Sequence, residues 1–113
     1  MQITVTDLQS GVKKVDLNGR MDTDATQSLA MEFTSVVATE KGQVVVDLSR
    51  VDFMSSLGIG VIVSGFKALK LLGGKMVLLN PQPIVTLVLE KTGITSLVPI
   101  VKDMKAALVT LKE

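Results

Sequence analysis

The 113-residue sequence contains no cysteine and no histidine. Without cysteine, the chain has no disulfide framework, no thiolate metal site and no thiol nucleophile. Without histidine, it lacks the commonest general base and metal ligand, which excludes Ser-His-Asp catalysis and most zinc sites. The only clustered acids are interpreted as capping and turn residues: Asp22, Asp24, Asp47 and Asp52. An enzyme is therefore the weakest hypothesis, and no metal or cofactor is expected.

The sequence also has few aromatic residues, little net charge and no long apolar run. All three aromatic residues are phenylalanine, which predicts an aliphatic core that includes methionine. Twelve basic and eleven acidic residues leave a net charge of +1, and the lysines are scattered, which argues against nucleic acid as a partner. The mainly apolar stretch 57–66 is too short to cross a bilayer, and no secretory signal is visible. We expect a cytoplasmic protein without membrane insertion.

The sequence does contain alternating strand and helix patterns. Hydrophobic residues make up 47% of the chain and charged residues 20%, which predicts one globular domain over residues 1–113. Residues 2–7 and 12–18 are predicted to form a hairpin that is broken at Ser10-Gly11 and ended by 19–22. We expect an α/β fold with a mixed, mainly parallel sheet of four to five strands and about four helices packed against it.

The first predicted helix starts at Asp24, with Gln27 three residues later as in a capping box, and stops near Lys41 and Gly42. Val44–Val46 indicate a buried central strand, followed by a polar turn over 47–52. The later predicted elements are a strand over 75–80, a helix from Pro83 to Thr92 with Ile84, Leu87 and Val88 inward, a short strand over 97–100, and a last helix from about Lys102 with Met104, Ala107, Leu108 and Leu111 inward.

Ser55 and Ser56 lie where the central strand leads into the second predicted helix. The side chain of Ser55 stands immediately before the helical pattern, where it can cap the free N–H groups of the first turn. Two hydroxyls at a helix N-terminus favour an anion, because the unpaired N–H groups and the helix dipole point at that position. The alternative is an N-cap followed by a polar first turn, with no further role.

The helix that follows has two apolar stripes. The stripe assigned to the core consists of Ile59, Ile62, Val63, Phe66 and Leu69. Leu57 and Val61 project to the opposite side, which is more apolar than a solvent face requires. Either a partner covers this second stripe, or a neighbouring segment does, namely the Pro81 loop or the third helix.

Four segments of the sequence carry a family pattern: Gly19-Arg20-Met21-Asp22, the strand Val-Val-Val-Asp-Leu at 44–48, the turn and helix start at Phe53–Gly60, and Gly73-Gly74-Lys75. Together they closely resemble the STAS-domain family of bacterial anti-sigma factor antagonists, over essentially the whole chain. In that family, a serine of the turn accepts a phosphoryl group from an ATP-dependent serine kinase that is itself an anti-sigma factor. The resemblance implies that Ser56 is the acceptor.

One position departs from the family pattern, because Ser55 stands where the family usually has aspartate, and it is a second candidate acceptor. The implied partner-binding residues are Asp22, Thr23, Ser55, Ser56, Leu57, Gly58, Gly60 and Val61. The unphosphorylated chain, a monomer or weak dimer, is expected to bind the kinase and release the sigma factor, and a serine phosphatase is a further expected partner. The alternative is an unphosphorylated STAS module that is a structural or ligand-binding component of a transporter or sensory complex.

Overall fold

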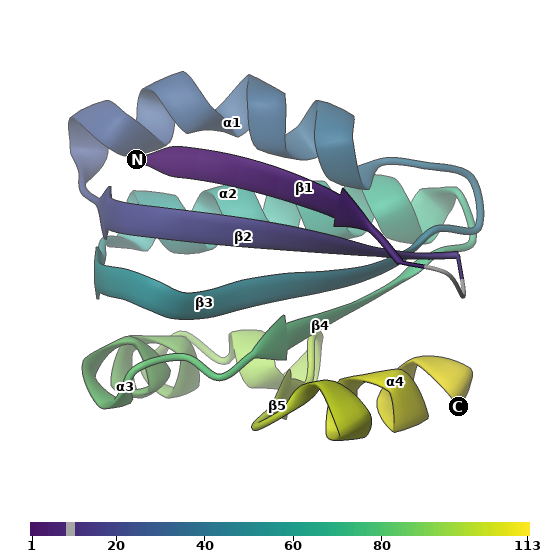
Figure 1. The fold of residues 1–113 in the computed structure, drawn as a ribbon. Helices are drawn as coiled ribbons and strands as arrows, with labels where there is room; N and C mark the ends of the chain where they lie inside the picture. The colour runs from purple at the N-terminus through teal and green to yellow at the C-terminus, as the bar shows by residue number, and fades with distance from the viewer. Residues whose placement is uncertain (9–10) are drawn as a thin grey trace.

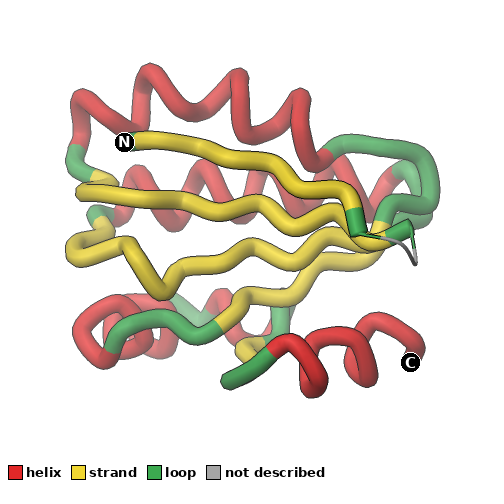
Figure 2. The backbone as a smooth tube through the Cα atoms, viewed as in Figure 1, coloured by secondary structure: helices red, strands yellow, loops and turns green. Residues whose placement is uncertain are grey.

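The computed structural model describes residues 1–8 and 11–113, and its elements alternate as the sequence predicts (Figures 1 and 2). In chain order they are β1 (Gln2–Asp7), β2 (Val12–Met21), α1 (Thr23–Val37), β3 (Gln43–Met54), α2 (Ser56–Leu71), β4 (Lys75–Leu79), α3 (Pro83–Lys91), the short 3-10 helix η1 (Ile94–Ser96), β5 (Ile100–Val101) and α4 (Met104–Lys112). The strands form one sheet in the order β1-β2-β3-β4-β5, in which β1 is antiparallel to β2 and the other neighbours are parallel. The predicted fold class is confirmed.

Helices pack on both faces of the sheet, because successive strand residues point to opposite sides. Val44 and Val46 of β3 belong to the larger core cluster, which includes residues of α1, α2 and α3. Val45, between them, packs on the other face with Ala107 and Leu111 of α4. Figure 1 shows α1 and α2 running side by side along one face of the sheet. The strand is therefore buried on both faces, which explains its continuous run of valines.

A charged network joins β2 and β3 on the face opposite α1 and α2. Lys14 Nζ lies 3.1 Å from Asp16 Oδ1 and 3.3 Å from Asp47 Oδ2. The Ser49 N–H donates to Asp47 Oδ1 at 2.9 Å. Burial alone would raise the pKa of Asp47, but the hydrogen bonds from Ser49 and Lys14 outweigh burial and lower that pKa. Burial alone would lower the pKa of Lys14, but its two carboxylate partners, Asp16 and Asp47, outweigh burial and raise that pKa.

This network lies in a strand that is longer than predicted. The sequence predicts a turn over 47–52, but β3 continues to Met54, and Leu48 and Val51 are buried along it. The pairing of β3 with β2 shifts register after Asp47, where the Ser49 N–H bonds to the Asp47 side chain. This irregularity removes the strict alternation of apolar and polar residues by which a strand is identified.

β2 also continues through the predicted turn at 19–22. Gly19 has a φ of 124°, a backbone conformation that glycine adopts without steric cost. A second register shift against β3 follows Gly19, and the strand ends at Met21. The predicted break at Ser10 lies outside the described residues. α1 ends at Val37, before the predicted stop near Lys41 and Gly42.

The inner face of α3 is offset by one position from the prediction. Val85 and Leu89 are fully buried, whereas Ile84 and Leu87 are 59% and 51% exposed. Val88 is partly buried against the core. Successive residues of a helix are about 100° apart around its axis, so an offset of one position turns the apolar stripe by about 100°.

The C-terminal elements are close to the prediction. β5 is Ile100–Val101 rather than 97–100, and α4 starts at Met104 rather than Lys102. Ala107 and Leu111 are buried as predicted, with Met104 and Leu108 partly buried beside them. Within the described residues, no helix has both the length and the apolar character needed to span a membrane.

Three glycines of α2 differ in what surrounds them. A Cβ atom added at Gly65 would lie 2.6 Å from a ring carbon of Phe33, and one added at Gly58 would lie 3.2 Å from the Cβ of Met21. A Cβ atom added at Gly60 would meet no atom of the described chain within 4 Å. A side chain at position 65 therefore requires Phe33 to move, one at position 58 would be tightly packed, and one at position 60 has room.

We predict opposite effects of two alanine substitutions in α2. Gly65→Ala should lower the free energy of unfolding by about 1–3 kcal/mol, because the added methyl overpacks the contact with α1. Gly60→Ala should leave it unchanged or raise it by up to about 1 kcal/mol, because alanine is the better helix former and has room. Urea unfolding of both variants measures the difference, and a loss of stability at position 60 equal to that at 65 would contradict the packing.

Candidate functional site

Ser55 and Ser56 lie at the N-terminus of α2, directly after the end of β3. Figure 1 shows that α2 begins at the side of the molecule where β2 and β3 end. Ser55 is the N-cap residue: its backbone is extended, and its Oγ accepts a hydrogen bond of 3.3 Å from the Gly58 N–H. Ser56 is the first helical residue and is exposed. The predicted cap is confirmed. The two hydroxyls are therefore not equivalent, since one is part of the helix cap and the other lies on the surface.

Asp22 is brought beside this turn by a backbone hydrogen bond. The Ser55 N–H donates to the carbonyl oxygen of Met21 at 3.0 Å, which fixes the start of α2 to the end of β2. Asp22 follows Met21 and caps α1, because its Oδ1 accepts from the Ala25 N–H at 3.0 Å. The predicted capping box starting at Asp24 is therefore wrong, since the cap is two residues earlier.

The surroundings of Asp22 contain one cation. Arg20 Nε lies 3.8 Å from Asp22 Oδ2, and the Arg20 guanidinium lies 4.3 Å from the centroid of the Phe53 ring. Both side chains of the Arg20–Asp22 pair are about half exposed, so the pair contributes little to stability. Thr23, the first residue of α1, is exposed beside them. Among the described residues, no group of three acidic, histidine or cysteine side chains is placed to hold a metal ion.

Leu57 and Val61, which form the second apolar stripe predicted for this helix, differ in their exposure. Leu57 is 48% exposed beside Ser56, but Val61 is only 8% exposed and belongs to the core cluster. The neighbour that covers Val61 is α1, and not the Pro81 loop or α3. A neighbouring segment therefore covers Val61, which is one of the two alternatives left open by the sequence, and the residue lies in the seam between α1 and α2. Helical periodicity gives the direction of a side chain but not which element packs against it.

A groove of about 310 Å³ lies between α1 and α2, next to the serine turn. The residues that line it are Thr26, Gln27, Ala30 and Thr34 of α1 and Leu57, Gly60, Val61 and Ser64 of α2. Of the predicted partner-binding residues, Leu57, Gly60 and Val61 thus meet at one groove, while Gly58 is buried beneath the turn. The α1 residues that line the groove were not predicted from the sequence, because the pattern of small and polar residues does not indicate which face of α1 packs against α2.

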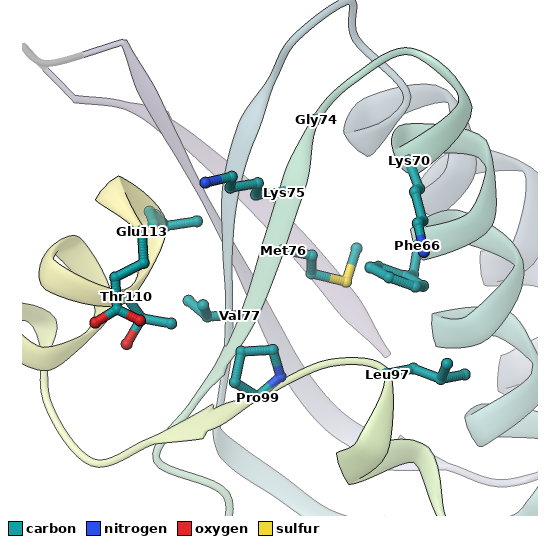
Figure 3. Close-up of a pocket in the computed structure, with 11 residues that line it drawn as sticks. Phe66, Lys70, Gly74, Lys75, Met76, Val77, Leu97, Pro99, Thr110 and Glu113 are labelled. Carbon is teal, nitrogen blue, oxygen red and sulfur yellow. The ribbon is translucent and has the colours of Figure 1, made fainter.

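A separate hollow of about 410 Å³ lies near the other end of α2, between that helix, β4 and α4 (Figure 3). In Figure 3, the sulfur of Met76 points toward the ring of Phe66, and Lys70 lies beside that ring. None of the predicted site residues lines this hollow. The candidate site is therefore the serine turn with its adjoining groove.

Comparison with known proteins identifies relatives over nearly the whole chain. A family model described as the STAS domain matches residues 4–107. BtrV of Bordetella bronchiseptica, provisionally named an anti-sigma factor antagonist, is 30% identical and covers 99% of this chain and 96% of its own. The anti-sigma F factor antagonist of Paenibacillus polymyxa is 28% identical over 90% of this chain and 88% of its own.

A solved structure extends the comparison to the fold. SpoIIAA of Bacillus, an anti-sigma factor antagonist, superposes in its unphosphorylated form with a TM-score of 0.74, at 20% identity over 93% of this chain and 92% of its own. The phosphorylated form of SpoIIAA superposes with a TM-score of 0.67 at 19% identity, covering 93% of this chain and 96% of its own. At these identities the likeness concerns the fold.

The two serines should differ in their effect on stability. Ser55→Ala should lower the free energy of unfolding by about 1 kcal/mol, because the Gly58 N–H loses its side-chain acceptor. Ser56→Ala should change it by no more than about 0.5 kcal/mol, because this side chain is exposed. Chemical denaturation measures both, with Ser55→Asp as a control that keeps a capping oxygen. Equal losses at 55 and 56 would contradict the assignment of the cap.

Proposed function

The chain belongs to the STAS-domain family, and we propose that it is an anti-sigma factor antagonist that works by partner switching. In this proposal, the unphosphorylated protein binds an anti-sigma factor that is also a serine kinase, and the sigma factor is released. Phosphorylation of Ser56 then weakens the complex. The support comes from the family and from two relatives that are named anti-sigma factor antagonists. The same family membership argues against the enzyme hypothesis.

The choice of Ser56 as acceptor rests on one observation, the different environments of the two hydroxyls. A phosphoryl acceptor has to enter the active site of its kinase, and Ser56 is exposed on the first turn of α2. Ser55 is less exposed, and its Oγ is engaged as the helix cap. A phosphate on Ser55 would have to displace that hydrogen bond. The exposed Ser56 is therefore the better acceptor. Ser55, which stands where the family usually has aspartate, is the poorer one.

A phosphate at Ser56 is compatible with the fold. It adds about −1.5 to −2 charges at neutral pH, beside the positive end of the helix dipole. The N–H groups of Gly58 and Ile59 bond to the side chain and carbonyl of Ser55. The N–H groups of Ser56 and Leu57 precede them and have no intrahelical acceptor, so they can face an anion. The modification should therefore leave the folded state intact.

The same phosphate opposes binding of a partner. Ser56 adjoins the exposed side chain of Leu57, and the acidic residue Asp22 directly follows Met21, whose carbonyl accepts from the Ser55 N–H. A partner that packs on Leu57 removes water from this region, so a phosphate there would be desolvated beside an existing negative charge. The energetic cost falls on the complex and not on the free protein, which is the requirement for a switch.

The first test uses the serine kinase encoded nearest to this gene, together with ATP. We predict a single phosphate on Ser56, detected by mass spectrometry, with Ser56→Ala unmodified and Ser55→Ala still modified. Ser56→Ala should bind the kinase with the affinity of the unphosphorylated wild type, because the hydroxyl that it lacks is small and exposed. A phosphate found only on Ser55 would refute the acceptor, and no phosphate on either serine would favour the unphosphorylated STAS module.

A second test concerns Leu57. Leu57→Lys should weaken binding to the kinase at least tenfold, because a charge replaces an apolar contact at the proposed interface, while the free energy of unfolding changes by no more than about 0.5 kcal/mol. Met31→Lys is the matched control, because Met31 is 86% exposed on α1 outside the groove, and it should change neither quantity. Calorimetry and thermal unfolding measure the two effects. A large loss of stability in Leu57→Lys would place Leu57 in the core instead.

A further inference from the structure

Gly60 is a glycine that the fold itself does not require. It lies in the first turns of α2, where glycine costs about 1 kcal/mol relative to alanine. It is exposed, its backbone is not in the left-handed region, and an added Cβ would meet no described atom within 4 Å. Gly58 and Gly65 of the same helix are explained by contacts with Met21 and Phe33. The open space at Gly60 belongs to the groove between α1 and α2.

Thr26, on the opposite wall of this groove, supplies a second and independent observation. Thr26 is 3% exposed, and its Oγ1 is buried without a hydrogen-bond partner among the described residues. A buried hydroxyl without a partner costs free energy, and most such groups in folded proteins are paired. Because threonine in a helix has two accessible side-chain rotamers, rotation about χ1 can move the hydroxyl to a second staggered position. The hydroxyl can therefore be turned toward a group that enters the groove.

The chemistry of the groove defines what fits it. None of the residues that line it is charged, and Ala30, Val61 and Leu57 provide apolar walls. Its volume of about 310 Å³ has room for one or two side chains. An uncharged, mainly apolar side chain with one hydrogen-bonding group matches both the walls and the hydroxyl of Thr26.

The groove is continuous with the proposed phosphorylation site. Ser56 and Gly60 are four residues apart in α2, so they lie one above the other on the same side of the helix. Leu57 belongs to the groove and to the surface beside Ser56. A partner that is sensitive to a phosphate on Ser56 therefore has the groove within reach.

We propose that this groove receives an uncharged side chain of the anti-sigma factor, which packs against Gly60 and hydrogen-bonds to Thr26. The inference rests on the proposed function and names the contact by which the unphosphorylated protein holds its partner. A phosphate on Ser56 acts at the mouth of this groove. The hydrated, negatively charged phosphate would lie where the inserted side chain has to make an apolar contact from which water is excluded.

The test fills the groove. Binding of the unphosphorylated protein to the same kinase is measured by calorimetry for wild type, Gly60→Leu and Ser64→Leu, since both leucines would occupy the space that the partner needs. We expect at least a tenfold loss of affinity in both variants and a smaller loss in Gly60→Ala. Ser35→Leu, at an exposed position of α1 outside the groove, is the matched control and should bind like wild type. Thermal unfolding of each variant confirms that it is folded.

Thr26→Val tests the polar contact, because valine has nearly the shape of threonine without the hydroxyl. In the free protein it should leave the melting temperature unchanged or raise it, since it removes an unpaired buried hydroxyl. In the complex it should weaken affinity about three- to tenfold, the loss of one hydrogen bond. Unchanged affinity in this variant would refute the contact to Thr26.

The outcomes separate this inference from the proposed function. If wild type and the groove variants bind the kinase equally well, the proposed function stands and the groove inference is overturned. If wild type does not bind at all, the proposed function fails, and the assigned occupant of the groove fails with it. The methyl groups of Thr26, Ala30 and Val61 give a direct check, because their NMR signals should shift when the kinase is added to wild type.

Discussion

The close contact between the end of β2 and the start of α2 determines the geometry of the whole site. The Ser55 N–H bonds to the carbonyl of Met21, and the side chain of Met21 packs under Gly58 so closely that an added Cβ would lie only 3.2 Å from the Met21 Cβ. Through this contact, the cap of α1 at Asp22 and the cap of α2 at Ser55 become neighbours, although they are more than thirty residues apart in the chain. A polar surface made of two helix N-termini is the result.

A second close contact, between α1 and α2, explains why the groove lies at Gly60 and not at Gly65. At Gly65 the helices are in direct contact, because the ring of Phe33 occupies the space of a Cβ. At Gly60, nearer the serine turn, the corresponding space is open. One glycine thus allows close packing of the two helices, while the other leaves a gap. Fixed packing at one position holds the groove walls in place at the other.

The sequence predicted the order of the elements, the hairpin, the double-sided burial of β3 and the capping role of Ser55, because each of these depends on local patterns. It did not predict that β3 runs through 47–52, since the register shift and the ion network at Lys14 are interactions between strands. It also left open what covers Val61, which faces away from the sheet and is covered by α1 rather than by the Pro81 loop or α3. The groove and the unpaired hydroxyl of Thr26 depend on which faces of two helices meet, and no spacing within either helix contains that information.

The serine at position 55 changes the electrostatics of the turn relative to the aspartate that is usual in the family. The cap formed by Ser55 is neutral, and the first turn of α2 contains no acidic residue. An aspartate cap would already place a negative charge at the helix N-terminus, where it interacts favourably with the dipole. With serine there, a phosphate on Ser56 would be the first negative charge in this turn and would not be repelled by a capping carboxylate. The neutral cap would therefore make a phosphate on Ser56 less costly within the protein than an aspartate cap would.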